Sequence, residues 1–242
     1  MLLNKIKNKL SSMFIKEKVN ERFDYINPQK ISYSQSGEDL LVDYIFKVRG
    51  LEKVSYLDIG ANHPLYINNT YIFYLKGSRG VNIEPNPKMI ERFIKLRPND
   101  ISIAAGAAPD KGELIYYELD SPELNTFSKE HALQMQEKGH TIHRVTIFPV
   151  ITINYIIATY FNNISPNVIF IDAEGMDFEL VNSIDFNIYK PEVLCVESVS
   201  YELDGSGKKD AKLIDLITSK GYMLYADTNI NSIFVRKDFW LL

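Results

Sequence analysis

The chain has 242 residues, a length at which an α/β domain often stays undivided and buries one substantial core. Its 45% hydrophobic and 24% charged residues are close to globular averages and exclude a disordered, collagen-like or coiled-coil chain. The formal net charge of −4 argues against a general nucleic-acid binder, because binding to phosphates needs a basic face. We therefore expect no nucleic-acid partner.

Cysteine, histidine and long apolar runs are scarce. The single cysteine, Cys195, lies in an apolar run and is expected to be a buried, reduced thiol. The histidines show no zinc-binding spacing. No apolar run approaches the roughly 18 residues of a membrane span. Lys5, Lys7 and Lys9 interrupt any signal-peptide core, so we expect a cytoplasmic protein.

Residues 1–30 are predicted to form a basic, amphipathic N-terminal extension before the domain at 31–242. Its apolar residues recur at helical spacing: Leu2, Leu3, Ile6, Leu10, Met13 and Phe14. Such a helix is able to lie on an anionic membrane surface, to pack against its own domain or a twin subunit in a homo-oligomer, or to fray. These alternatives stay open.

Strand-like and helix-like stretches alternate from residue 37 onward. The predicted strands are 54–59, 80–84, 101–105, 114–119, 145–151, 168–172, 193–197, 222–226 and 232–235. The predicted helices are 37–46, 70–76, one that begins at Asn86 and Pro87, 129–138, 154–161 and 210–220. Ser36 is predicted to cap the first helix, and Asn86 the third.

Alternating strands and helices imply a mainly parallel sheet with helices on both faces, in one domain. We expect residues 120–144 to cover the working edge of that sheet, with 114–119 as a fourth strand. The reversal at residues 227–229 predicts a final antiparallel hairpin.

Acidic residues stand at the ends of several predicted strands, where an open parallel sheet binds its ligands. The first strand runs into Asp58 and Gly60, the second ends at Glu84, and two later ones end at Asp172 and Glu197. Gly60 lets the backbone approach a ligand without an intervening Cβ. Glu84 follows it at roughly the 20-residue spacing of an acid that holds both ribose hydroxyls. Together they indicate an adenosine-containing cofactor.

The turn after the first strand argues against a phosphate-containing cofactor. It contains one glycine, whereas a nicotinamide dinucleotide normally needs the GxGxxG turn as a diphosphate cradle. A GxxxxGK[ST] motif is also absent from the sequence, which disfavours a nucleoside triphosphate. S-adenosylmethionine carries a ribose and an adenine without phosphates and fits better.

Five blocks of sequence, in order, resemble the FkbM family of methyltransferases. They are Ser34–Leu40, Asp58–Pro64, Asn69–Tyr71, Val81–Pro87 and Ile171–Asp177, and the resemblance covers residues 31 to 237. It implies a class I methyltransferase with a seven-stranded, doubly wound sheet. It also implies transfer of a methyl group from S-adenosylmethionine to a hydroxyl, often on a sugar in polysaccharide biosynthesis.

The resemblance also implies which residues surround the cofactor. Asp58, Gly60, Ala61 and Asn62 are expected around its methionine half, covered by Gln35 and Glu38. Glu84, with Pro85 and Asn86, is expected at the ribose, and Ala105, Gly106 and Ala107 near the adenine.

A hydroxyl acceptor needs a general base or a metal ion that acidifies it. The candidates at the open end of the sheet are His63, Asp172, Glu174 and Glu197. Each also has a structural interpretation: a turn residue for His63, a helix cap for Asp172 and a helix-terminus charge for Glu174. The three acids are candidate ligands of Mg²⁺ or Mn²⁺, or groups that bond sugar hydroxyls directly.

A further group of residues is expected to contact the substrate: Asn69, Thr70, Thr126, Phe127 and His131. The expected acceptor is a small molecule or nucleotide-linked sugar. Two alternatives remain: a nicotinamide-dependent sugar dehydrogenase or epimerase, and a non-catalytic relative that only binds the cofactor.

Overall fold

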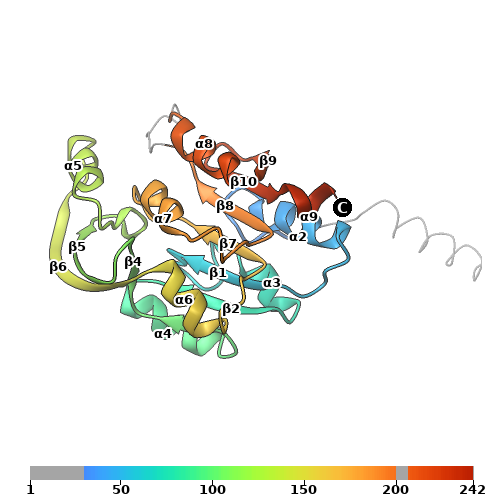
Figure 1. The fold of residues 1–242 in the computed structure, drawn as a ribbon. Coiled ribbons are helices and arrows are strands. Elements are labelled where there is room, and N and C mark those ends of the chain that lie inside the picture. The colour runs from blue at the N-terminus through green and yellow to red at the C-terminus, as the bar shows by residue number, and fades with distance from the viewer. Residues whose placement is uncertain (1–29, 200–206, 242) are drawn as a thin grey trace, which may run out of the picture. The chain divides into compact units, whose positions relative to one another are not determined.

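The predicted buried strands pair at the centre of the computed structural model, which describes residues 30–199 and 207–241 (Figure 1). They form a seven-stranded sheet in the order β3-β2-β1-β7-β8-β10-β9. Its strands are β1 (Ser55–Ile59), β2 (Arg79–Ile83), β3 (Ile101–Ile103), β7 (Val168–Ile171), β8 (Val193–Glu197), β9 (Tyr222–Asp227) and β10 (Asn231–Arg236). The basic helix expected in the first twenty residues lies outside the described part of the chain.

The sheet is parallel up to its last strands. β10 runs antiparallel to both β8 and β9, whereas the other neighbours pair in parallel. The predicted doubly wound, mostly parallel sheet with a C-terminal antiparallel hairpin is therefore confirmed. The chain builds β1, β2 and β3 outward in one direction and then returns to place β7 on the other side of β1. The reversal point between β1 and β7 is where such sheets bind ligands.

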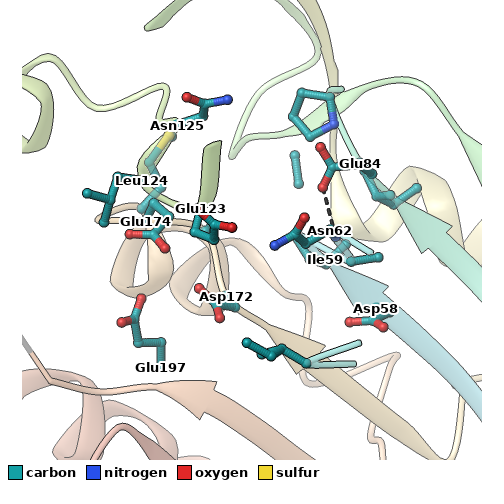
Figure 2. Close-up of a pocket in the computed structure, with 18 of the residues that line it drawn as sticks. Asp58, Ile59, Asn62, Glu84, Glu123, Leu124, Asn125, Asp172, Glu174 and Glu197 are labelled. Atoms are coloured by element: carbon teal, nitrogen blue, oxygen red, sulfur yellow. Dashed lines mark hydrogen bonds between the residues drawn. The ribbon is translucent and has the colours of Figure 1, made fainter. Parts of the chain in front are cut away.

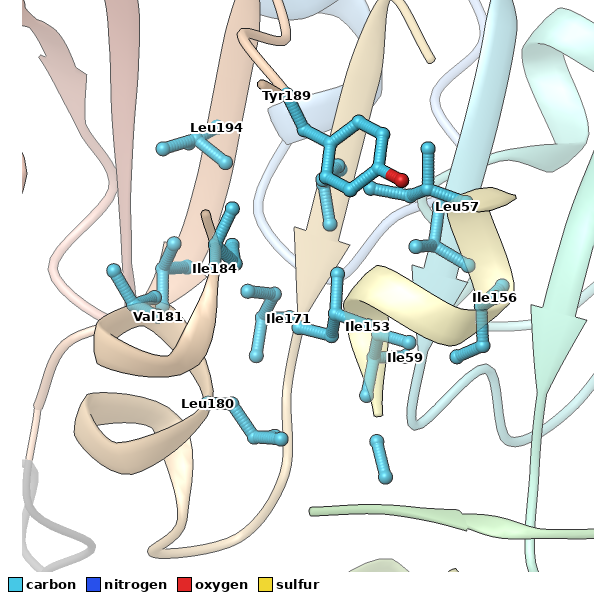
Figure 3. Packing of buried hydrophobic residues seen from close by; sticks show 14 of the residues in the cluster. Leu57, Ile59, Ile153, Ile156, Ile171, Leu180, Val181, Ile184, Tyr189 and Leu194 are labelled. Carbon is cyan, nitrogen blue, oxygen red and sulfur yellow. The ribbon is translucent and has the colours of Figure 1, made fainter. Parts of the chain in front are cut away.

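Helices cover both faces of this sheet. On one face pack α2 (Glu38–Val48), α3 (Tyr71–Leu75) and α9 (Lys237–Leu241); on the other, α6 (Ile153–Tyr160), α7 (Asp177–Ser183) and α8 (Ala211–Ser219). Side chains along β1 alternate between them, with Tyr56 in the first cluster and Leu57 in the second. Figure 3 shows the second cluster, where Ile153 of α6 and Leu180 of α7 approach Ile171 of β7. Burial on both faces explains the continuous apolar runs of the central strands.

Helix α4 (Pro87–Leu96) begins as its sequence predicts. The Asn86 side chain accepts a hydrogen bond from the amide of Lys88 at 3.0 Å, and Pro87 occupies the first turn. The prediction of Ser36 as the cap of α2 is wrong. Gly37 is the N-cap residue with φ 90°, and the hydroxyl of Ser34 accepts from the amide of Gly37 at 3.1 Å.

A second, three-stranded sheet stands beside the first, at the left of Figure 1. It contains β4 (Gly106–Ala107), β5 (Gly112–Leu119) and β6 (Ile142–Ile151), accompanied by the short 3-10 helix η1 (Pro122–Leu124) and α5 (Lys129–Glu137). We call residues 106–151 the cap. The helix and the extended stretch predicted within 120–151 are confirmed.

The prediction of 114–119 as a strand of the main sheet is wrong, since β5 pairs with β6 instead. A strand of the main sheet is covered on both faces, whereas Ile115 on the outer face of β5 is 48% exposed. The strand predicted at 101–105 is shorter than expected, because β3 ends at Ile103 and the chain enters the cap at Gly106. Among the described helices, none is both long enough and apolar enough to cross a bilayer.

Candidate active site

A cavity of about 390 Å³ opens at the carboxyl ends of β1, β2, β7 and β8, under the cap (Figure 2). This volume is within the range of small-molecule sites, roughly 300–1,000 Å³. Its wall includes every residue predicted for the cofactor except Glu38, and also Asn69, Phe127, Asp172, Glu174 and Glu197. Asn62, Ile67, Glu174 and Asn229, all on this wall, have left-handed backbone conformations. Such conformations in non-glycine residues concentrate at functional sites.

The turn after β1 forms one side of the cavity, and Gly60 fixes its shape. Gly60 has φ 76°, and a Cβ at this position would lie 1.8 Å from the backbone oxygen of Asp172. The absent side chain therefore lets the turn approach the end of β7. This differs from the expected reason, which was close approach to a ligand.

Glu84 is held in one orientation by the backbone around it. One carboxylate oxygen accepts from the amide of Asn62 at 2.9 Å, and the other from the amide of Asn86 at 2.7 Å. Burial raises the pKa of Glu84 to about 7, although these two hydrogen bonds oppose the shift. Each oxygen keeps a second lone pair for a ligand.

The cap closes the cavity over Gly106. A Cβ on Gly106 would lie 2.4 Å from the ring of Phe127, so the ring rests directly on this glycine. Phe127 also packs against Tyr116 of β5, with ring centroids 4.7 Å apart. Both aromatic residues line the cavity beside the Ala105–Ala107 turn, which provides a flat apolar surface at this end.

Asp172, Glu174 and Glu197 converge at the other end, as Figure 2 shows. Each offers a carboxylate oxygen, and these oxygens lie within 4.8 Å of one another. Burial raises the pKa of Asp172 to about 6 and that of Glu197 well above its usual range. A side-chain hydrogen bond between the two lowers the pKa of Asp172 and raises that of Glu197. The directions of these two shifts favour Glu197 as the donor and Asp172 as the acceptor of this hydrogen bond.

Glu174 is held in its left-handed conformation, with φ 49°, by residues of the cap. The hydroxyl of Thr126 donates to the backbone oxygen of Glu174 at 2.7 Å. The His131 ring packs against Gly175, and its Nε2 lies 3.5 Å from a carboxylate oxygen of Glu174. Thr126 and His131, predicted as substrate contacts, are thus placed behind the wall, where they support Glu174.

Glu38 and Thr70 are also behind the wall, because both are fully buried. One Glu38 oxygen accepts from the hydroxyl of Thr228 at 2.6 Å and from the side-chain amide of Asn231 at 3.2 Å. The hydroxyl of Thr70 donates to Asp58 at 2.8 Å. Glu38 and Thr70 therefore contact wall residues rather than the cavity itself.

His63 adopts its structural interpretation. Its Nδ1 accepts from the amides of Leu65 at 3.2 Å and Tyr66 at 3.1 Å, and the side chain is not among the described groups that line the cavity. Burial and the nearby Arg92 lower its pKa. The structure thus separates His63 from the carboxylates with which the sequence grouped it.

Sequence reasoning missed several residues that line the cavity or support its wall. Asn229 and Asn231, from the β9–β10 hairpin, line the cavity, although Asn229 was interpreted only as part of a turn. Asp177 is nearly buried and accepts from the amides of Ala173 and Gly175, which shapes the loop that contains Glu174. The left-handed φ of 75° at Asn229 is a conformation that asparagine tolerates, but no local pattern predicts its place on the cavity wall.

A family model described as the methyltransferase FkbM domain matches residues 58–224. No curated protein matches the chain.

Among solved structures, a TehB-like S-adenosylmethionine-dependent methyltransferase from Corynebacterium glutamicum is similar over 91% of this chain and 97% of its own, with 10% identity and a TM-score of 0.44. An O-methyltransferase from Bacillus cereus, in complex with S-adenosylhomocysteine, is similar over 93% and 89%, with 13% identity and a TM-score of 0.40. The 1,6-didemethyltoxoflavin-N1-methyltransferase of Burkholderia thailandensis, with bound 1,6-didemethyltoxoflavin and S-adenosylhomocysteine, is similar over 96% and 88%, with 8% identity and a TM-score of 0.40.

Proposed function

Because this chain belongs to the FkbM methyltransferase family, we propose that it transfers the methyl group of S-adenosylmethionine to a hydroxyl oxygen of a sugar. Family membership makes the chain an S-adenosylmethionine-dependent methyltransferase. The hydroxyl as acceptor group and the sugar as acceptor class are the further steps of the proposal.

The cavity suits a cofactor that has a ribose and a positive charge but no phosphates. The remaining lone pairs of the two Glu84 oxygens could accept from two ribose hydroxyls, and the aromatic end under the cap suits the adenine. Asp58 and Gln35 remain for the methionine end. Among the described residues of the wall there is no lysine, arginine or histidine to neutralise a diphosphate. This charge balance disfavours a nicotinamide dinucleotide.

One observation carries the assignment to a hydroxyl: the Asp172–Glu197 pair at the end of β7 and β8. A hydroxyl is a poor nucleophile until its proton is removed, and a base is most effective when its pKa is near the working pH. The Asp172 carboxyl, whose pKa burial raises to about 6, meets this requirement, and the Glu197 carboxyl beside it provides a further group for contact with the acceptor hydroxyl.

The acidic wall also limits the acceptor. Glu123 of the cap, together with Asp172, Glu174 and Glu197, lines the acceptor end of the cavity with acidic groups. The reacting part of the acceptor should therefore be a neutral, hydroxyl-rich ring. In a nucleotide-linked sugar, the phosphates would have to lie outside this wall.

A divalent cation is the alternative role for the trio of carboxylates. Their oxygens are close enough to share one ion, and an all-oxygen ligand set suits Mg²⁺ or Mn²⁺. Asp172, Glu174 and Glu197 would hold it, and the ion would acidify the acceptor hydroxyl. The three acids serve transfer to a hydroxyl in either role.

The test has two stages. Calorimetric titration with S-adenosylhomocysteine, with NAD as control, should show binding of the first compound alone. Transfer of a labelled methyl group to a panel of free and nucleotide-linked sugars is then measured with EDTA, Mg²⁺ or Mn²⁺. Rates that persist in EDTA favour the base, and rates that need the ion favour the metal.

Replacement of the base provides the decisive variant. Asp172→Asn should keep the fold and lower kcat by about 10²-fold or more, the usual contribution of a general base. Asp215→Asn, on the exposed surface of α8, is the matched control and should keep the wild-type rate. An Asp172→Asn enzyme with a normal rate, or methylation of amines alone, would contradict the proposal.

A further inference from the structure

A completely buried arginine lies directly behind the cofactor side of the cavity. Arg97 follows the last turn of α4 and has no exposed surface. Its Nε donates to Asp100 at 2.9 Å, and Nη2 lies 2.7 Å from the same carboxylate oxygen. A buried guanidinium is costly unless its charge and its N–H groups are satisfied, and among the described residues Asp100 forms the salt bridge with it.

The rest of the guanidinium points toward the β1 turn. Nη1 donates to the side-chain oxygen of Asn68 at 3.0 Å, and Nη2 donates to the hydroxyl of Thr70 at 3.0 Å. The Asn68 oxygen also accepts from the amide of Thr70 at 3.0 Å. Arg97 therefore fixes the orientation of two polar side chains, Asn68 and Thr70, which are two positions apart in the sequence.

Both of these side chains also donate hydrogen bonds to residues 58–61, at the end of β1 and in the turn after it. Thr70 uses its hydroxyl proton on a carboxylate oxygen of Asp58 at 2.8 Å, while it accepts from Arg97. The amide group of Asn68 donates to the backbone oxygen of Ala61 at 3.1 Å. Asp58 and Ala61 both line the cavity.

We propose that Arg97 is a positioning residue for the amino-acid end of S-adenosylmethionine, which it orients through Thr70, Asn68 and the Asp58–Ala61 turn. This inference rests on the proposed cofactor. Arg97 touches neither the cofactor nor the acceptor; it determines the direction and the charge of the Asp58 carboxylate that faces the cofactor ammonium group.

The electrostatics around Asp58 support this role. Burial raises the pKa of Asp58 to about 6, and Asp172 and Asp100 act in the same direction. The Thr70 hydrogen bond and the charge of Arg97 oppose them. Without this support a fully buried carboxyl beside other acids would take up a proton and lose its attraction for an ammonium group.

Two ligands separate positioning from a general effect on the fold. S-adenosylhomocysteine carries the amino-acid end, whereas 5′-methylthioadenosine has the same adenine, ribose and sulfur without it. We expect Thr70→Val to weaken binding of S-adenosylhomocysteine by about tenfold, since a hydrogen bond to a charged group is lost. Binding of 5′-methylthioadenosine should stay within twofold of wild type.

Three further variants make the measurement decisive. Thr70→Ser keeps the hydroxyl and should restore wild-type affinity for both ligands. Arg97→Lys keeps the ion pair with Asp100 but lacks the fork that reaches both Asn68 and Thr70, so it should show the same selective loss of S-adenosylhomocysteine binding. It tests the inference if Thr70→Val does not fold. Tyr222→Phe loses a buried hydroxyl bonded to the Pro191 oxygen at 2.7 Å, far from the cavity, and should bind both ligands normally.

Calorimetry with the two ligands, alongside thermal unfolding, distinguishes the outcomes. A loss confined to S-adenosylhomocysteine supports the inference. Equal losses for both ligands, or none for either in both Thr70→Val and Arg97→Lys, overturn it and leave the proposed cofactor untouched. A wild-type protein that binds neither ligand overturns the proposed function itself.

Discussion

Replacement of Gly60 by alanine probes the contact between the β1 turn and the end of β7. A left-handed alanine costs about 1–2 kcal/mol. The new Cβ would also lie 1.8 Å from the Asp172 backbone oxygen, so the two segments must separate by roughly 1.5 Å to reach an ordinary contact.

That movement strains the hydrogen bonds on both sides of the contact. The amide of Asp172 donates to Ile59 at 3.0 Å, and the amide of Gly60 donates to Ile83 at 3.0 Å. The loss of one of them adds about 1 kcal/mol, so we expect Gly60→Ala to lower the free energy of unfolding by about 2–3 kcal/mol. For a domain of this size the midpoint of thermal unfolding should fall by roughly 4–12 °C.

Two other glycines serve as controls in the same assay. Gly139 has φ 98° with open space around its missing Cβ, so Gly139→Ala isolates the cost of the backbone conformation. Gly112→Ala has neither constraint and should be close to neutral. If Gly60→Ala is no less stable than Gly139→Ala, the close contact with Asp172 does not exist as described. Because both segments line the cavity, affinity for S-adenosylhomocysteine should fall at least tenfold in Gly60→Ala alone.

Three further predictions concern buried carboxyls. Glu84→Gln should weaken S-adenosylhomocysteine binding about tenfold, because its amide nitrogen cannot accept from a backbone amide; a change below twofold in calorimetry would refute the ribose role. Burial raises the pKa of Glu84 and of Asp177 to about 7, so the uncharged forms stabilise the ligand-free fold. Stability in urea should therefore fall as the pH rises from about 4 through 7, less steeply in Glu84→Gln, and a rise in stability over this range would contradict the burial. Glu38→Gln removes charge-assisted bonds from the β9–β10 hairpin and should cost about 1.5–3 kcal/mol in urea unfolding, whereas the exposed Glu113→Gln should be neutral.

The central sheet, and the part of the site at the ends of its strands, follow from patterns that are local in the chain. The apolar runs of β1, β7 and β8 are long enough to require burial on both faces, and this pattern is local in the chain. Asn86 and Pro87 mark the start of α4 for the same reason, since capping depends on adjacent residues. Asp58 and Glu197 lie in the last two residues of their strands, and Glu84 and Asp172 directly follow theirs, so a parallel arrangement was enough to bring the four to one edge.

Which polar groups line the cavity and which lie behind its wall depends on tertiary contacts. From the sequence, Thr70 and His131 cannot be distinguished from residues that contact a ligand. The fold shows that they contact Asp58 and Glu174 instead. In the sequence Arg97 is a basic residue at the end of a helix, with no sign of burial. Only the folded chain brings Asn68 and Thr70 within hydrogen-bonding distance of its guanidinium. Hydrogen bonds of this kind depend on strand order and on the approach of loops within about 3 Å, and periodicity in one chain carries no information at that scale.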